Sequence, residues 1–156
     1  MTSFQESFEA RTPEYIAAAW DFADRSDKVD RLWVYVSHDR GAYYGGAFYR
    51  VGGEVFEPYQ LSKAIGGLDT SHDAQIWMFN RINDQTMDML LELDDVEEMP
   101  ARMILRFDTA EQSLDAEFYH ESLQPGVADE DLRPEARLAD QWFERLKATG
   151  NDSAAP

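Results

Sequence analysis

Apolar residues recur along the chain at two spacings, one typical of helices and one typical of strands. Helical spacing marks three segments, residues 12–25, 73–98 and 131–148. In the first segment Thr12 precedes Pro13, so a capping hydroxyl comes directly before a proline at the first helical position. The pattern therefore predicts three helices, of which the first begins at Thr12.

The second helical segment contains a long apolar stripe. We expect this stripe to face the core, with Ser71 or Asp73 as the capping residue. Four acids stand at its far end and would oppose the helix dipole if the helix continued to Glu98. An end near Leu93 would leave these acids in a loop instead. The stripe consists of Ile76, Trp77, Phe79, Ile82, Met87, Leu90, Leu91 and Leu93.

Alternating apolar and polar positions, the period of a strand, mark five further segments. Turn residues separate neighbouring strands, with Asp39-Arg40-Gly41 after the first and Gly52-Gly53 after the second. Consecutive strands joined by such short turns pair as antiparallel hairpins. The five segments are residues 32–36, 43–51, 54–57, 102–107 and 114–118.

Two features of the strands indicate their surroundings. Gly45-Gly46 would weaken a strand interior unless a bend or the close approach of another backbone requires small residues. The apolar residues of the last hairpin define its inner face, which places Arg106 on the outer face beside Asp115 and Glu117. We therefore expect some of the acidic residues to be paired within the fold.

The order helix, three strands, helix, two strands, helix predicts an α+β fold. We expect a single domain over residues 1–149, in which an antiparallel sheet of about five strands packs against three helices. A chain of 156 residues that is 44% hydrophobic and 13% aromatic can build one core. The polar tail, residues 150–156, is predicted to be disordered.

Charge is distributed unevenly along the chain. Residues 84–135 contain sixteen acidic and three basic residues, and so carry −13 of the formal net charge of −17. Such a field repels nucleic acid, anionic membranes and anionic substrates, and it attracts basic proteins. The acidity could also reflect genome composition or a salt-rich cytoplasm, but such a bias would cover every region. We expect a basic protein partner, and neither nucleic acid nor membrane.

The sequence offers little catalytic chemistry. Cysteine is absent, which excludes disulfides, a thiolate nucleophile and zinc–thiolate sites. His38, His72 and His120 lie in different predicted elements without metal-ligand spacing. Carboxylates are too numerous to single out a catalytic pair. We expect no enzyme, metal or cofactor, although a carboxylate base in a cleft that acts on a cationic substrate stays open.

The N-terminal residues bear on localisation. Residues 1–11 lack the basic start and apolar run of a signal peptide, and no segment approaches eighteen apolar residues. We therefore expect a cytoplasmic protein.

The order of elements resembles the YezG-like immunity proteins, the antitoxins of bacterial polymorphic toxin systems. The resemblance covers residues 12–147 and rests on the first two strands, the long helix with Trp77, the hairpin over 103–119 with Tyr119 and Glu121, and the last helix with Trp142. It implies a non-catalytic, cytoplasmic bacterial protein that binds one cognate toxin, often a nuclease, and blocks it.

The acidic residues suit that function. A nuclease presents a cationic groove to phosphate, and a folded acidic surface can occupy the groove as a phosphate mimic. The alternative is a domain that binds a small molecule or peptide on an aromatic sheet face around Tyr35, Tyr44 and Phe48. The residues predicted to bind the partner are Asp88, Glu92, Asp94, Asp95, Glu97, Glu98, Asp115, Glu117, Glu121, Asp129, Glu130 and Asp131.

Overall fold

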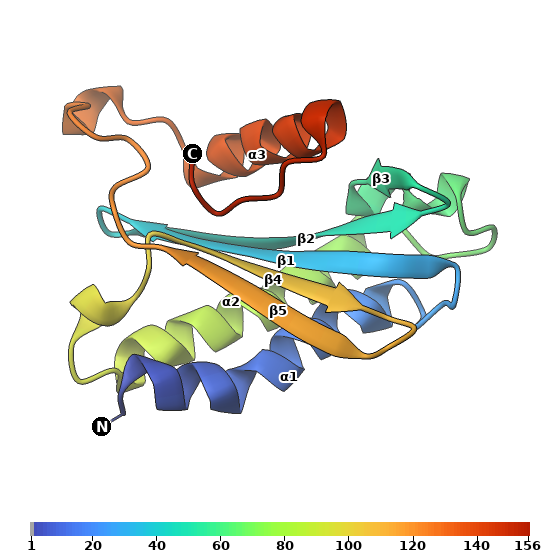
Figure 1. Cartoon of the computed structure of the whole chain (residues 1–156), viewed down its shortest axis with the longest axis horizontal. Coiled ribbons are helices and arrows are strands. Elements are labelled where there is room, and N and C mark those ends of the chain that lie inside the picture. Colours follow the sequence, from blue (N-terminus) through green and yellow to red (C-terminus); the bar gives the residue numbers. More distant parts are fainter. Residues whose placement is uncertain (1) are drawn as a thin grey trace.

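The computed structural model describes residues 2–156, and it has helices on both faces of one five-stranded sheet (Figure 1). The predicted α+β class and the order of elements are confirmed. The elements are α1 (Phe4–Phe22), β1 (Val29–Asp39), β2 (Ala42–Val51), β3 (Glu54–Phe56), α2 (His72–Glu92), β4 (Arg102–Asp108), β5 (Ser113–Tyr119) and α3 (Glu135–Thr149). Short 3-10 helices lie in the connections, namely η1 (Pro58–Lys63), η2 (Val96–Glu98) and η3 (Asp129–Asp131).

The strands are ordered β3-β2-β1-β4-β5, and every neighbouring pair is antiparallel. Figure 1 shows α1 and α2 on one face of the sheet and α3 on the other. The alternation in β1 explains why both faces are covered. Leu32 and Val34 join the core under α1 and α2, whereas Trp33 and Tyr35 join a second core under α3. Because side chains alternate along a strand, one strand serves both cores.

Helix α1 begins at Phe4, so the predicted start at Thr12 is wrong. The side chain of Ser3 caps the helix by accepting a hydrogen bond from the backbone N–H of Glu6 at 3.2 Å. Pro13 lies inside the helix, where a proline costs about 3 kcal/mol because it removes one backbone hydrogen bond. Aromatic rings in the first two turns pack on β5 and help to offset this cost.

Helix α2 ends at Glu92, so the four acids that follow it lie in the connection to β4, two of them in η2. Ser71 caps its start by accepting from the backbone N–H of Ala74 at 3.2 Å, as predicted. The helix buries Met78, Ile82 and Met89. The predicted inward stripe is wrong for the exposed residues Ile76, Trp77, Met87 and Leu91. The apolar positions of this helix are too many for one face, so the excess faces outward.

The glycine pair in β2 allows α2 to lie close to the sheet. A Cβ atom added to Gly45 would lie 2.6 Å from Cγ2 of Ile82, and one added to Gly46 would lie 3.3 Å from the ring of Phe79. We expected a bend or the close approach of another backbone here; the structure shows a close approach, but it is made by side chains of α2.

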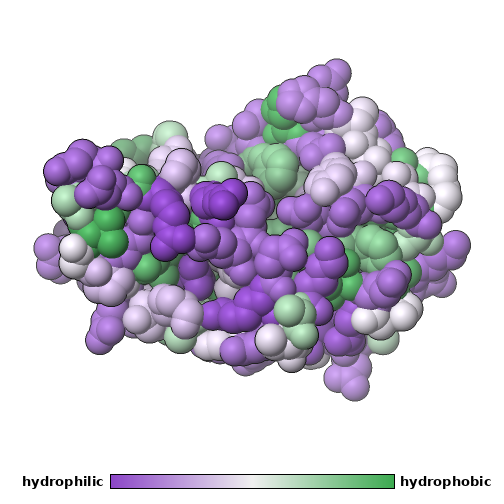
Figure 2. Space-filling model, turned by 90° about the horizontal axis from the view of Figure 1, so that it is seen from above, coloured by the Kyte–Doolittle hydropathy of each residue, from purple (hydrophilic) through white to green (hydrophobic). Residues whose placement is uncertain are grey.

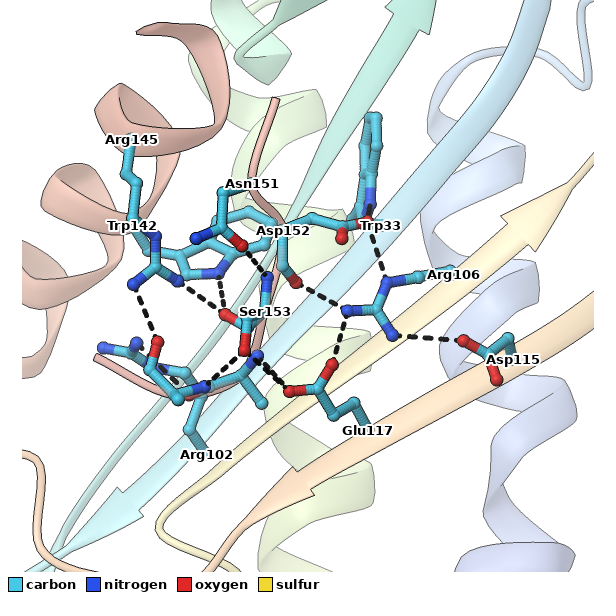
Figure 3. Close-up of polar contacts among 12 residues, drawn as sticks. Trp33, Arg102, Arg106, Asp115, Glu117, Trp142, Arg145, Asn151, Asp152 and Ser153 are labelled. Carbon is cyan, nitrogen blue, oxygen red and sulfur yellow. Dashed lines mark hydrogen bonds and ion pairs between the residues drawn. The ribbon is translucent and has the colours of Figure 1, made fainter. Parts of the chain in front are cut away.

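The C-terminal tail lies across the sheet on the α3 side, so the predicted disorder of residues 150–156 is corrected (Figure 3). Gly150, with φ of 73°, ends α3 and reverses the chain. The carboxylate of Asp152 then accepts hydrogen bonds from Trp33 Nε1 and Arg106 Nε, both at 2.8 Å, and Ala154 is fully buried. Buried donors on the sheet thus fix a segment whose own composition favours disorder.

Candidate functional site

Most of the predicted partner-binding acids gather at one end of the sheet, which we call the acidic end. This end consists of the end of α2 with η2, the segment from the end of β5 to η3, and the turn between β1 and β2, at the left of Figure 1. The strands bring these segments together although they are far apart in sequence. The predicted residues that lie there are Glu92, Asp94, Asp95, Glu97, Glu98, Glu121, Asp129, Glu130 and Asp131.

Ion pairing divides the twelve predicted acids into two groups. Five make ion pairs: Arg11 binds Asp88 and Glu92, Arg40 binds Asp129, and Arg106 binds Asp115 and Glu117. The other seven make no ion pair within residues 2–156, and all of them are exposed at the acidic end. These are Asp94, Asp95, Glu97, Glu98, Glu121, Glu130 and Asp131. The members of the predicted set that lack an ion pair therefore all lie at one end of the sheet.

Asp115 and Glu117 lie apart from the acidic end and have a structural role. The guanidinium of Arg106 reaches Asp115 at 3.1 Å, Glu117 at 2.8 Å and Asp152 at 2.8 Å (Figure 3). The predicted outer-face pairing is confirmed, and the tail adds a third carboxylate. Because the Arg106 side chain is only 9% exposed, these acids neutralise a buried charge.

The η2 segment is held firmly against the start of α1. Thr2 pairs with the end of α2 in a short backbone bridge, with Thr2 N donating to Glu92 O at 3.0 Å. Asp95 caps η2 by accepting from Glu97 N at 3.0 Å, and Glu98 accepts from Phe4 N at 3.2 Å. These contacts present the neighbouring free carboxylates in a fixed arrangement.

Exposed apolar side chains accompany these acids. On α2, Asp84, Met87, Asp88 and Leu91 share one face because they are three or four residues apart. Leu91 is 76% exposed, and Met87 and Val96 of η2 are also exposed. We call this region the α2–η2 surface; it comprises Asp84, Met87, Asp88, Leu91, Asp94, Val96 and Glu97. The sequence pattern placed Met87 and Leu91 in the core, and the excess width of the apolar stripe was the signal that some of its residues face outward.

The aromatic sheet face of the alternative interpretation is covered. Phe48 stacks on Phe143 of α3 with ring centroids 4.7 Å apart, and Tyr35 lies 5.6 Å from Trp142. Seen from this side, the molecular surface is mostly hydrophilic, with apolar residues in separate patches (Figure 2). A ligand could reach these rings only if α3 or the tail moved.

The first residue of α3, Glu135, has a buried carboxylate. Glu135 is 7% exposed, and neither of its carboxylate oxygens has a hydrogen-bond partner within residues 2–156. Burial and the negative charge of Asp39 raise the pKa of Glu135 to about 7, against a smaller opposing effect of Arg102. It borders a cavity of about 230 Å³. A carboxylate with this pKa suits a general acid or base, so a catalytic interpretation would rest on Glu135.

Replacing this carboxylate with an amide, Glu135→Gln, should stabilise the protein by about 2 kcal/mol at pH values of about 8. The pKa is about 7 in the folded chain and 4.5 for an ordinary glutamate, so the unfolded chain binds fewer protons between these values. Wild-type stability therefore falls as the pH rises through this window. Glutamine removes that penalty.

Urea unfolding of both proteins between about pH 3 and about pH 8 tests this prediction, because this range extends beyond both pKa values. The gain should vanish below about pH 4, where both states are protonated. A variant that is less stable than the wild type at the upper limit would show that the attraction to Arg102 outweighs the cost of burial.

Residues 2–156 contain no group of three or more His, Asp or Glu side chains placed to hold a metal ion. In the same part of the chain, no helix has the length and apolar character that crossing a bilayer requires. Burial lowers the pKa of His38 on β1, although the charge of the neighbouring Asp39 opposes this effect.

No model of a known protein family matches this chain, and no curated protein matches it either. The resemblance to YezG-like immunity proteins stays a prediction from the sequence. A functional interpretation must therefore rest on the geometry of the acidic end and the α2–η2 surface.

Proposed function

We propose that this chain is a non-catalytic immunity protein of a bacterial cytoplasm, which binds and neutralises a basic, nuclease-type protein toxin. The observation that carries the proposal is the composition of the α2–η2 surface. Leu91 is 76% exposed, and the exposed residues Asp94 and Glu97, three and six positions further along the chain, make no ion pair within residues 2–156. Apolar anchors beside unpaired charges of one sign favour a protein partner of the opposite sign.

The apolar residues distinguish this surface from a merely solvated acidic face. Protein interfaces bury apolar anchors at their centre and keep charged residues at the rim. Leu91 and Met87 supply the anchors, and Asp84 and Asp88 flank them on the same helix face. The carboxylates would steer a cationic partner and speed its capture, whereas the apolar residues would slow its release.

A nuclease fits this surface because its substrate groove must be cationic. Lys and Arg side chains that bind successive phosphates would find carboxylates at η2 and, at the same end of the sheet, at η3. Occupation of the groove excludes nucleic acid, so inhibition needs no chemical step by this protein.

The test compares wild-type protein with two double variants as tagged baits in the native host. Asp94→Lys with Glu97→Lys reverses charge on the α2–η2 surface and spares the hydrogen bonds of Asp95 and Glu98. The control pair, Asp27→Lys with Glu111→Lys, makes the same charge change at the opposite end of the sheet. The wild type and the control should recover a basic toxin-like protein that salt displaces, and the first variant should lose it.

Kinetics with the recovered partner separate the two kinds of contact. The charge reversal should lower the association rate at least about tenfold at low salt and weaken its salt dependence. Leu91→Ser should mainly raise the dissociation rate. Equal binding by the wild type and the Asp94/Glu97 variant would place the interface elsewhere, and recovery of no basic protein would contradict the proposed function.

A further inference from the structure

A cavity of about 650 Å³ lies between the end of α3 and the hairpin of β2 and β3. It is at the end of the sheet opposite the acidic end (Figure 1). Its charged lining residues are four basic ones, Arg31, Arg50, Lys63 and Lys147, and two acidic ones, Glu54 and Asp152. The lining thus carries a formal charge of +2 in a protein whose net charge is −17.

The cavity draws its residues only from the less acidic parts of the chain. All lining residues lie between 31 and 63 or between 146 and 152, and none lies within the acidic stretch 84–135. The fold therefore separates a cationic hollow from the acidic end. In a strongly acidic protein, this separation gives the cavity a positive local potential that favours the binding of an anion.

The two arginines face each other across neighbouring strands. Arg31 and Arg50 are direct partners in the register of β1 and β2, where like charges repel. Arg50 binds Asp30 through Nε at 2.8 Å. Arg31 makes no ion pair within residues 2–156, its Nε is buried without a hydrogen-bond partner, and its guanidinium lies 5.5 Å from the centre of the Trp33 ring. The charge of Arg31 is therefore not paired with a carboxylate of the described chain, and a bound anion would supply that partner.

The other charges of the lining leave the cavity positive. Lys63 and Lys147 are exposed and make no ion pair within residues 2–156. The Asp152 carboxylate is already bound by Arg106 and Trp33. Glu54, at the turn between β2 and β3, is the acid that makes no ion pair and therefore opposes an anion.

Apolar side chains complete the cavity wall. Val55 lies beside Arg50 in the sheet register, and Leu146 closes the side formed by α3. A ligand with an anionic head and an apolar or planar body would match both parts. A phosphate monoester carries a charge of about −1.5 to −2 at neutral pH, close to the opposite of the lining charge.

We propose that this cavity binds a small phosphate monoester, with Arg31 and Arg50 holding the phosphate and the apolar wall holding the organic part. Guanidinium groups suit this role because their N–H groups donate to two phosphate oxygens at once. The site is separate from the α2–η2 surface, so its existence does not depend on the proposed immunity function.

Phenyl phosphate is the probe, titrated into isotope-labelled protein in the millimolar range while backbone amide signals are recorded. Signals of Trp33, Arg50 and Val55 should shift with a saturable dependence. Inorganic phosphate should bind more weakly because it lacks the apolar part, and phenol should not bind. Equally strong binding of inorganic phosphate would indicate a general anion site, and binding of phenol would indicate an apolar pocket. Either result would overturn the proposal.

Matched variants test the assigned residues. Arg31→Gln and Arg50→Gln should each weaken phenyl phosphate binding about tenfold, because each loses charge-assisted hydrogen bonds. Arg137→Gln, at an exposed position of α3 outside the cavity, makes the same charge change and should leave binding unaltered. Glu54→Gln should strengthen binding because it removes the opposing charge.

Because Arg31 packs on Trp33, replacing it could disturb the fold. A second pair of variants avoids this problem. Lys63→Gln and Lys147→Gln alter exposed side chains without ion pairs, and each should weaken binding by about threefold, as expected for one screened charge. An absence of amide shifts with phenyl phosphate, or an equal loss of affinity in the Arg137 variant, would overturn the proposal.

Discussion

Replacing Arg106 with leucine should lower the free energy of unfolding by about 3 kcal/mol at neutral pH, because a buried ion network loses its centre. Arg106 is the shared partner of Asp115, Glu117 and Asp152, and it joins β4, β5 and the tail (Figure 3). Leucine fills part of the space but leaves three carboxylates without their cation. The tail should then loosen, since Asp152 retains only its hydrogen bond with Trp33.

The pH dependence identifies charge as the cause of this loss. Burial is the largest single influence and raises the pKa values of Glu117 and Asp152, but the hydrogen bonds and charge of Arg106, together with the hydrogen bonds from the tail to Glu117 and from Trp33 to Asp152, lower both on balance. An acid with a lowered folded-state pKa stabilises the fold above its unfolded pKa, and this contribution is lost as the pH falls through the folded value. The difference between wild type and Arg106→Leu should therefore shrink below about pH 4.

Urea unfolding at pH values of about 7 and 3 measures this difference. Arg137→Leu is the control, because Arg137 is exposed on α3 and such surface changes stay within about 0.5 kcal/mol. An equal loss of stability at both pH values would assign the effect of Arg106 to packing of its side chain instead of its charge.

Replacing Gly45 with valine should cost about 3 kcal/mol, because the new side chain would overlap Ile82 of α2. A Cβ at this position already lies 2.6 Å from Ile82 Cγ2, and Ile82 is fully buried. Strand propensity predicts the opposite sign, since valine favours strands and glycine weakens them. The measured sign therefore decides between local preference and packing.

Gly66→Val is the matched control for that experiment. A Cβ on Gly66 meets no heavy atom within 4 Å, and its φ lies outside the left-handed region, so this change should be close to neutral. In the pair Gly45→Ala and Ile82→Leu, the leucine removes Cγ2, and the double variant should recover part of the loss caused by alanine. No recovery would mean that the cost of Gly45→Ala arises elsewhere.

Local signals in the sequence were sufficient for most of the strands and for the last helix. The turn at Gly52-Gly53 has φ of 59° and 83°, values that glycine accepts readily, and it joins β2 and β3 as predicted. In the last helix Leu138, Trp142, Phe143 and Leu146 recur at helical spacing, and all four are buried. Hydrophobic periodicity and turn residues depend on only a few neighbouring positions, so the sequence alone was enough to predict these elements.

Features that depend on distant contacts could not be predicted. The start of α1 depends on rings that pack on Phe118, and the order of the tail depends on Trp33 and Arg106. The same limit applied to the candidate site. Composition indicated an acidic surface, but only the fold separates Glu92, which pairs with Arg11, from Asp94, which makes no ion pair within residues 2–156.

The order of strands gives the acidity a further physical role. A sheet has two edges whose unpaired backbone groups can recruit strands from another copy and begin aggregation. Here one edge is β3, only three residues long, and the other is β5, which carries Asp115 and Glu117. Arg106 offsets one of the three negative charges of Asp115, Glu117 and Asp152, so two copies that approached along β5 would each bring a formal charge of −2 to the contact. The negative charge of β5 therefore protects its exposed edge against self-association, whichever partner the acidic end binds.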